Sequence, residues 1–143
     1  NSLAIKVKKK FKKIDLILSP AMGGIIVGYE IGRILSIETI FCERVNKKFT
    51  LRRGFSIKKN SRVLIVEDVI TTGKSSLECV KLIKKFKAKL IGFACLIDRT
   101  NNEKIKDKII SQVELKIPTY NKKDLPDQLK KIPITKPGSR FLR

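Results

Sequence analysis

The sequence predicts an α/β fold with a central parallel sheet flanked by helices. Two observations lead to this prediction. Short apolar runs of the kind found in buried strands alternate with segments of helical periodicity. The first unit, residues 16–42, reads as strand, turn, helix and strand, and such a βαβ unit joins parallel strands by a right-handed crossover. With 143 residues, of which 42% are hydrophobic, the chain has the length of one domain with its own core.

The first third of the chain contains four predicted features. Residues 2–13 have the spacing of an amphipathic helix with a lysine-rich polar face. The apolar run 16–18 predicts a buried strand that stops at Pro20, because proline has no amide hydrogen to donate. Helical spacing follows over 25–35, and residues 38–42 return to a strand pattern.

The middle of the chain repeats this alternation after a polar interruption. Residues 43–55 are basic and polar, which indicates a long loop or a loose hairpin. The most strand-like run, 62–66, is followed by a helix that we expect to begin near Ser75. Residues 89–97 predict another buried strand, and 113–117 a further one.

The composition also predicts how the chain is divided. We expect a core domain over 1–117 and a tail over 118–143 that packs on it, because the tail is rich in proline and lysine. Within the tail, residues 125–131 have the pattern of one helix.

The strong positive charge does not by itself predict a nucleic-acid partner. The chain has 33 Lys and Arg against 13 Asp and Glu, a formal charge of +20. These residues are scattered, and the densest block, 8–13, alternates with apolar positions as a solvated helix face does. Only two Tyr and no Trp are available for base stacking. We therefore expect no specific nucleic-acid partner.

Histidine and cysteine usage excludes several chemistries. Without histidine, His-based zinc sites, Ser-His-Asp triads and Cys-His pairs are impossible. The cysteines Cys42, Cys79 and Cys95 lie far apart without a CxxC motif, which indicates reduced, buried thiols and a cytoplasmic location. No secretory signal pattern occurs, and no apolar run approaches the ~18 residues that cross a bilayer, so no membrane partner is expected.

Four polar loops fall where predicted strands end, at 19–24, 43–54, 67–75 and 98–102. In open α/β sheets ligands bind beyond the carboxyl ends of the strands. We therefore expect these loops to form one site.

The segment 67–76 combines two chemistries. Thr71, Thr72, Gly73 and Ser75 can surround a phosphate at a helix start, while the preceding acidic pair, Glu67 and Asp68, would face a polyhydroxyl group or a metal ion. Together they describe a site for ribose 5-phosphate.

Two other phosphate-binding motifs do not fit this chain. A Walker A loop requires glycine five positions before Gly73, where Asp68 stands. The GxGxxG dinucleotide fingerprint is absent as well. The alternative of a purely structural helix cap would leave two carboxylates at a strand end without a ligand, which is costly.

Residues 63–75 resemble the phosphoribosyl-diphosphate signature of type I phosphoribosyltransferases. Within that family the chain resembles the orotate phosphoribosyltransferases over nearly its whole length. Residues 19–24 are similar to the pyrophosphate loop, 41–55 to the mobile basic loop of one bacterial branch, 95–99 to the strand end whose arginine holds orotate, and 136–140 to the tail of that branch.

The resemblance implies transfer of the 5-phosphoribosyl group from phosphoribosyl diphosphate to orotate, which gives orotidine 5′-phosphate and pyrophosphate in pyrimidine biosynthesis. It further implies Mg²⁺ bound through phosphoribosyl diphosphate, with no metal site of the protein's own, and a homodimer. The residues implied to bind phosphoribosyl diphosphate are Ala21, Gly23, Glu67, Asp68, Val69, Ile70, Thr71, Thr72, Gly73, Lys74 and Ser75. Those implied for catalysis are Arg44, Lys48, Arg52, Arg53 and Asp68, and those for orotate binding are Thr71 and Arg99.

The chain departs from the family pattern in two places. The basic loop contains neither the Asp nor the His of many relatives, which leaves open which side chain meets pyrophosphate. The family also carries an N-terminal hood that contacts the base, and nothing here corresponds to it, so either the chain is a fragment or its base site is incomplete.

Alternatives remain open at this point. The protein as a whole could be a phosphoribosyltransferase-like RNA-binding regulator of pyrimidine genes, or a purine phosphoribosyltransferase. Arg99 could be a surface residue paired with Asp98 or Glu103, and the basic loop a solvated hairpin.

Overall fold

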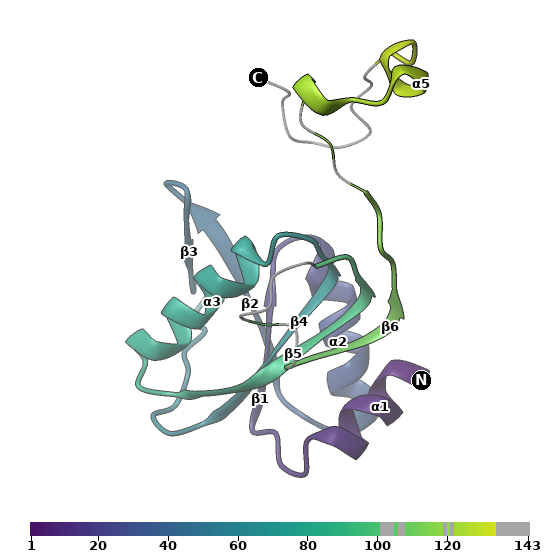
Figure 1. Cartoon of the computed structure of the whole chain (residues 1–143). Coiled ribbons are helices and arrows are strands. Elements are labelled where there is room, and N and C mark those ends of the chain that lie inside the picture. The colour runs from purple at the N-terminus through teal and green to yellow at the C-terminus, as the bar shows by residue number, and fades with distance from the viewer. Residues whose placement is uncertain (101–104, 106–107, 119, 121, 134–143) are drawn as a thin grey trace.

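Six strands form one sheet in the order β3-β2-β1-β4-β5-β6 in the computed structural model (Figure 1), which describes residues 1–100, 105, 108–118, 120 and 122–133. Every pair of neighbouring strands in it is parallel except β2 and β3. The described elements are α1 (Ser2–Lys10), β1 (Leu16–Pro20), α2 (Gly23–Leu35), β2 (Thr39–Val45), β3 (Lys48–Thr50), β4 (Arg62–Ile70), α3 (Lys74–Lys85), β5 (Lys89–Asp98), β6 (Ile109–Glu114), the 3₁₀ turn η1 (Lys122–Asp124) and α5 (Asp127–Lys130). The predicted α/β class with a central parallel sheet is confirmed.

Helices cover both faces of the sheet, and the strand sequences show why. Leu16 and Leu18 of β1 pack in the core cluster that contains residues of α3, whereas Ile17 between them packs with residues of α1 and α2. β4 alternates in the same way along 63–66. A strand that buries both faces needs apolar residues at successive positions, which is why these runs are continuous rather than alternating.

The first helix is shorter than its sequence pattern predicts. It ends at Lys10, because Phe11 adopts an extended conformation with φ −112° and ψ 104°. The Phe11 ring then covers Gly92 of β5, where a Cβ atom would collide with the ring. Tertiary packing of an aromatic side chain therefore outweighs local helical periodicity here.

The basic segment after β2 is a hairpin, the second of the two forms that the sequence allowed. β2 and β3 pair in antiparallel register, with Val45 opposite Lys48. The two linking residues, Asn46 and Lys47, have φ values of 49° and 64°, as a two-residue type I′ turn requires. The usual glycine is missing from this turn, which weakened the sequence signal.

The last strand lies earlier than expected, at Ile109–Glu114 rather than 113–117. Beyond it η1 and α5 stand apart from the sheet (Figure 1), and α5 buries none of its residues. The predicted division at residue 117 and the packing of the tail on the core stay predictions, and the family-like segment 136–140 lies outside the described residues. None of the helices in the described ranges has the length and apolarity needed to cross a membrane.

The three cysteines are free and buried, as the sequence predicts. The sulfur atoms of Cys42 and Cys79 lie 3.6 Å apart, between β2 and α3. This contact and burial raise the pKa of Cys79, and burial raises the pKa of Cys95 to about 12. The raised pKa values and burial keep Cys79 and Cys95 protonated and unreactive, and burial alone shields Cys42.

Helix α2 approaches β1 closely at Gly28, where an added Cβ atom would lie 1.9 Å from Ser19 Oγ. We expect Gly28→Ala to destabilise the fold by about 1–3 kcal/mol, the usual cost of overpacking, although alanine has the higher helix propensity. Urea unfolding measures this difference. Arg33→Ala, at an exposed position of the same helix whose ion pair with Glu30 lies at the surface, is the matched control and should change stability little. Equal effects of the two substitutions would contradict the close approach.

Candidate active site

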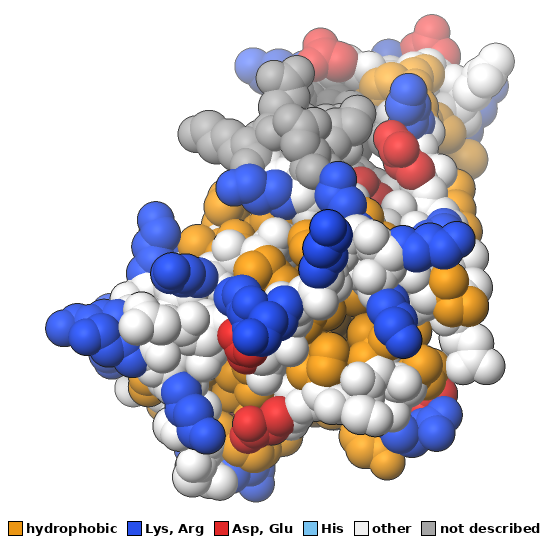
Figure 2. All heavy atoms as spheres, turned by 90° about the horizontal axis from the view of Figure 1, so that it is seen from below, with side chains coloured by type: hydrophobic (Ala, Val, Ile, Leu, Met, Phe, Trp, Pro, Cys, Tyr) orange, Lys and Arg blue, Asp and Glu red, His pale blue; other side chains and the backbone are white. Residues whose placement is uncertain are grey.

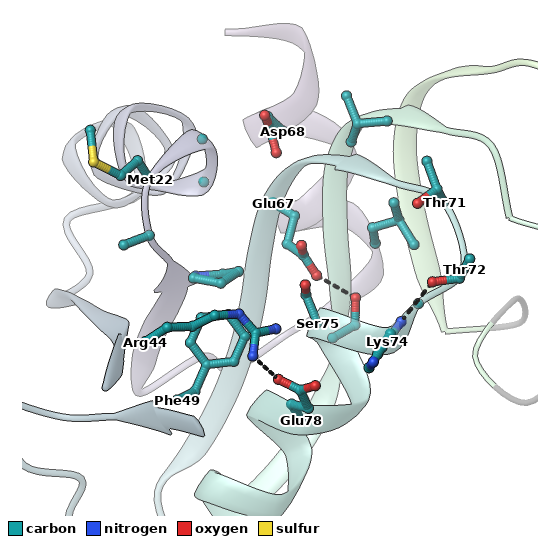
Figure 3. A pocket seen from close by; sticks show the side chains of 18 of the residues that line it. Met22, Arg44, Phe49, Glu67, Asp68, Thr71, Thr72, Lys74, Ser75 and Glu78 are labelled. Atoms are coloured by element: carbon teal, nitrogen blue, oxygen red, sulfur yellow. Dashed lines mark hydrogen bonds and ion pairs between the residues drawn. The ribbon is translucent and has the colours of Figure 1, made fainter. Parts of the chain in front are cut away.

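A cavity of about 820 Å³ opens at the carboxyl edge of the sheet. Its walls come from the loop after β1, the β2–β3 hairpin, the end of β4 and the first turns of α3 (Figure 3). The chain runs to opposite sides of the sheet from β1 and β4, so the cavity lies at the point where the strand order reverses. This is where open α/β sheets bind ligands.

The two carboxylates of β4 have different environments because successive strand residues point to opposite faces. Glu67 is 7% exposed, and its Oε1 accepts a hydrogen bond from Ser76 Oγ of α3. Burial raises the pKa of Glu67, partly offset by this hydrogen bond. Asp68 lies against the loop after β1, where a Cβ atom at Gly23 would fall 2.1 Å from Asp68 Oδ2. Figure 3 shows the two side chains pointing apart.

The bend between β4 and α3 presents backbone amides and hydroxyls to the cavity. Gly73 has φ +70°, which lets the chain turn sharply into the helix that begins at Lys74. Thr72 Oγ1 accepts a hydrogen bond of 3.3 Å from the Lys74 amide. The first turn of α3 contains no acidic residue, so its amides and positive dipole end are well suited to an anion.

Arg44 forms a basic wall opposite this bend. Its Nη1 lies 2.6 Å from Glu78 Oε2 and donates a hydrogen bond of 3.0 Å to the Lys47 carbonyl oxygen. Its guanidinium carbon lies 4.1 Å from the centre of the Phe49 ring. Three contacts therefore hold one guanidinium group at the cavity wall (Figure 3).

All the residues predicted for phosphoribosyl diphosphate binding meet in this cavity. Those that line it are Ala21, Gly23, Glu67, Asp68, Val69, Ile70, Thr71, Thr72, Gly73, Lys74 and Ser75. Of the residues predicted for catalysis, Arg44 and Asp68 line it as well. The assignment of roles within the cavity stays a prediction.

The other predicted basic residues lie outside the cavity lining. Lys48 lines a second cavity, between β3 and α3. Arg52 and Arg53 lie 3.7 and 3.4 Å from Glu43 of β2. The hairpin register separates them from the cavity, which sequence spacing alone did not show.

Arg99 is exposed at the end of β5, and its amide donates a 2.8 Å hydrogen bond to the Ile70 carbonyl. This bond places it beside the bend that starts at Thr71. Asp98, one of its suggested ion-pair partners, is 5% exposed and accepts a 2.8 Å hydrogen bond from the Thr100 amide. Glu103, the other suggested partner, lies outside the described residues.

The cavity lining also includes Phe49, Ser76 and Glu78, to which the sequence analysis gave no role of their own. A helical projection from Ser75 would have placed Glu78 on the cavity side, one turn later. No sequence signal pointed to Phe49, whose place depends on the hairpin register.

Comparison with known proteins agrees with this geometry. A family model described as phosphoribosyl transferase domain matches residues 1–124. Orotate phosphoribosyltransferase of Parvibaculum lavamentivorans is 46% identical over 99% of this chain and 74% of its own length, and that of Methylorubrum populi is 48% identical over 99% and 73%. The crystal structure of adenine phosphoribosyltransferase from Thermoanaerobacter pseudethanolicus superposes with a TM-score of 0.66 at 20% identity, over 80% of each chain, which shows the shared fold. The chain therefore belongs to the phosphoribosyltransferase family, in its orotate phosphoribosyltransferase branch.

Proposed function

We propose that the protein transfers the 5-phosphoribosyl group of phosphoribosyl diphosphate to orotate, which yields orotidine 5′-phosphate and pyrophosphate. The observation that carries this proposal is the single cavity that joins the acidic pair of β4 to the hydroxyl-rich bend before α3. Relatives named orotate phosphoribosyltransferase, at 46% and 48% identity, support orotate as the base and a role in pyrimidine biosynthesis.

The geometry suggests how the chain would lower the barrier. The bend at 71–75 and the start of α3 bind the 5′-phosphate, and Asp68 faces the ribose hydroxyls. Arg44 and Lys47 lie on the opposite wall, where they would stabilise the charge that grows on departing pyrophosphate. Displacement at C1 then needs positioned substrates and charge stabilisation rather than a covalent nucleophile.

Magnesium fits this site as an ion carried by the substrate. Among the described residues no group of three or more His, Cys, Asp or Glu side chains is placed to hold a metal ion. Glu67 is engaged by Ser76, and the half-buried Asp68 offers the hard oxygen donors that Mg²⁺ prefers. When bound, Mg²⁺ supplies positive charge to the diphosphate oxygens.

The alternatives receive less support. Nothing in the comparisons favours an RNA-binding regulator, and Figure 2 shows lysine and arginine spread among apolar and acidic side chains over the visible face rather than gathered into one stripe. The solved adenine phosphoribosyltransferase shares the fold at 20% identity. A likeness at that level supports the fold and gives no support to adenine as the base for this chain.

A homodimer and a cytoplasmic location remain proposals. Met22, which caps the start of α2, and Ile26 and Tyr29 within the helix lie about one turn apart and are 83%, 78% and 61% exposed. Such an apolar row beside the cavity supports pairing with a second copy.

Asp68→Asn removes one charge from the ribose side of the cavity while the shape is retained. We expect kcat to fall at least roughly tenfold with orotate, because a charge-assisted hydrogen bond to the ribose becomes a neutral one. Steady-state kinetics measures this, with a circular dichroism spectrum as the folding control. Unaltered turnover would mean that the acidic pair is structural.

Arg99→Ala tests the choice of base. A guanidinium can bind the orotate carboxylate through two hydrogen bonds. Its loss should weaken orotate use by about 1.5–3 kcal/mol, or roughly 10- to 150-fold in kcat/KM, with a nearly unchanged KM for phosphoribosyl diphosphate. An orotate KM equal to that of the wild type would remove Arg99 from the base site.

Arg44→Ala and Arg52→Ala form a matched pair on the basic hairpin. Arg44 lines the cavity, whereas Arg52 lies 3.7 Å from Glu43 outside it. Loss of Arg44 should reduce kcat by at least about tenfold, more than it raises the KM for phosphoribosyl diphosphate, because the charge on pyrophosphate grows toward the transition state. Arg52→Ala should reduce kcat less. Equal losses would indicate general electrostatic attraction by the whole hairpin.

A further inference from the structure

The ion pair between Arg44 and Glu78 crosses from the hairpin to α3 at the wall of the cavity (Figure 3). Both side chains line the cavity, with exposed fractions of 37% for Arg44 and 25% for Glu78. An acidic side chain at the wall of a cavity for a diphosphate needs an explanation, because it repels the ligand and occupies the cation that the ligand requires.

Arg44 has two further contacts that do not depend on a negative charge. Its guanidinium carbon lies 4.1 Å from the centre of the Phe49 ring, and Nη1 donates a 3.0 Å hydrogen bond to the Lys47 carbonyl oxygen. Both partners belong to the β2–β3 hairpin, whose register is set by its two-residue turn. The hairpin alone therefore keeps the guanidinium at the cavity wall.

Glu78 thus contributes chiefly a competing charge. It stands on α3 three residues after Ser75, within one turn of the bend that faces the 5′-phosphate, and it lies 2.6 Å from the same Nη1 atom. An incoming anionic oxygen would approach the same guanidinium group, whose charge Glu78 now neutralises. The carboxylate and the anion therefore compete for one cation.

We propose that Glu78 competes with pyrophosphate for Arg44. Glu78 pairs with Arg44 in the resting enzyme, and Arg44 leaves Glu78 for the pyrophosphate group during the reaction. By taking Arg44 back, Glu78 weakens the binding of free pyrophosphate and speeds its release. This inference rests on the proposed function, since it requires that the cavity accept a diphosphate.

Titration calorimetry with inorganic pyrophosphate tests the competition. Glu78→Gln keeps the size of the side chain and removes its charge, so the Kd for pyrophosphate should fall about three- to fivefold, the upper range for a partly exposed ion pair. Glu78→Asp, which retains the charge, should stay within about twofold of the wild type. Glu30→Gln is the control for net charge, because Glu30 forms a 2.8 Å ion pair with Arg33 on α2, outside the cavity lining.

A double-mutant cycle shows whether Glu78 acts through Arg44. In an Arg44→Ala background Glu78→Gln should no longer tighten pyrophosphate, and the product-inhibition constant should follow the same pattern. Weaker binding by Glu78→Gln alone, or an equal effect with and without Arg44, would overturn the inference and leave the proposed function intact. Failure of the wild-type protein to bind pyrophosphate would overturn both.

Discussion

The period of two along β4 is the constraint on which the site depends. This strand continues in extended form from the buried run 63–66 through the acidic pair to Ile70. Because successive side chains point to opposite faces, Glu67 is directed to α3 and Asp68 to the loop that precedes α2. The end of β4 thereby contributes one carboxylate on the side of α2 and one on the side of α3. A register shift of one residue would turn each carboxylate to the opposite face of the sheet.

The fold was predictable where local signals and tertiary packing agree. The continuous apolar runs of β1, β4 and β5 and the bend after β4 identified the sheet and the site from sequence alone. Predictions were wrong where distant contacts decide. Phe11 ends α1 because its ring packs on Gly92, which lies far away in the sequence. The last strand was misplaced because its pairing with β5, which places Ile109 opposite Phe93, decides where it begins.

The candidate site was predictable for the residues of one continuous bend and less so for those brought together by the hairpin. Basic residues at 44–53 look equivalent in a sequence, yet the turn at Asn46 and Lys47 directs Arg44 into the cavity and leaves Arg52 beside Glu43. The turn type depends on two positive φ values that neither residue type guarantees. The excess of lysine in the sequence did not help to locate the site, because the cavity is lined by both basic and acidic side chains.

All three thiols are buried, so their reactivity toward a reagent in solution reports local unfolding of the elements that cover them. Cys42 and Cys79 lie between β2 and α3, and Cys95 lies within β5, so a water-borne alkylating reagent reaches them only when those elements separate. The rate of alkylation then measures how often the sheet and its covering helix come apart. Any ligand that bridges the hairpin and α3 should protect the Cys42–Cys79 pair more than Cys95, so that the difference in alkylation rate reports occupancy of the cavity.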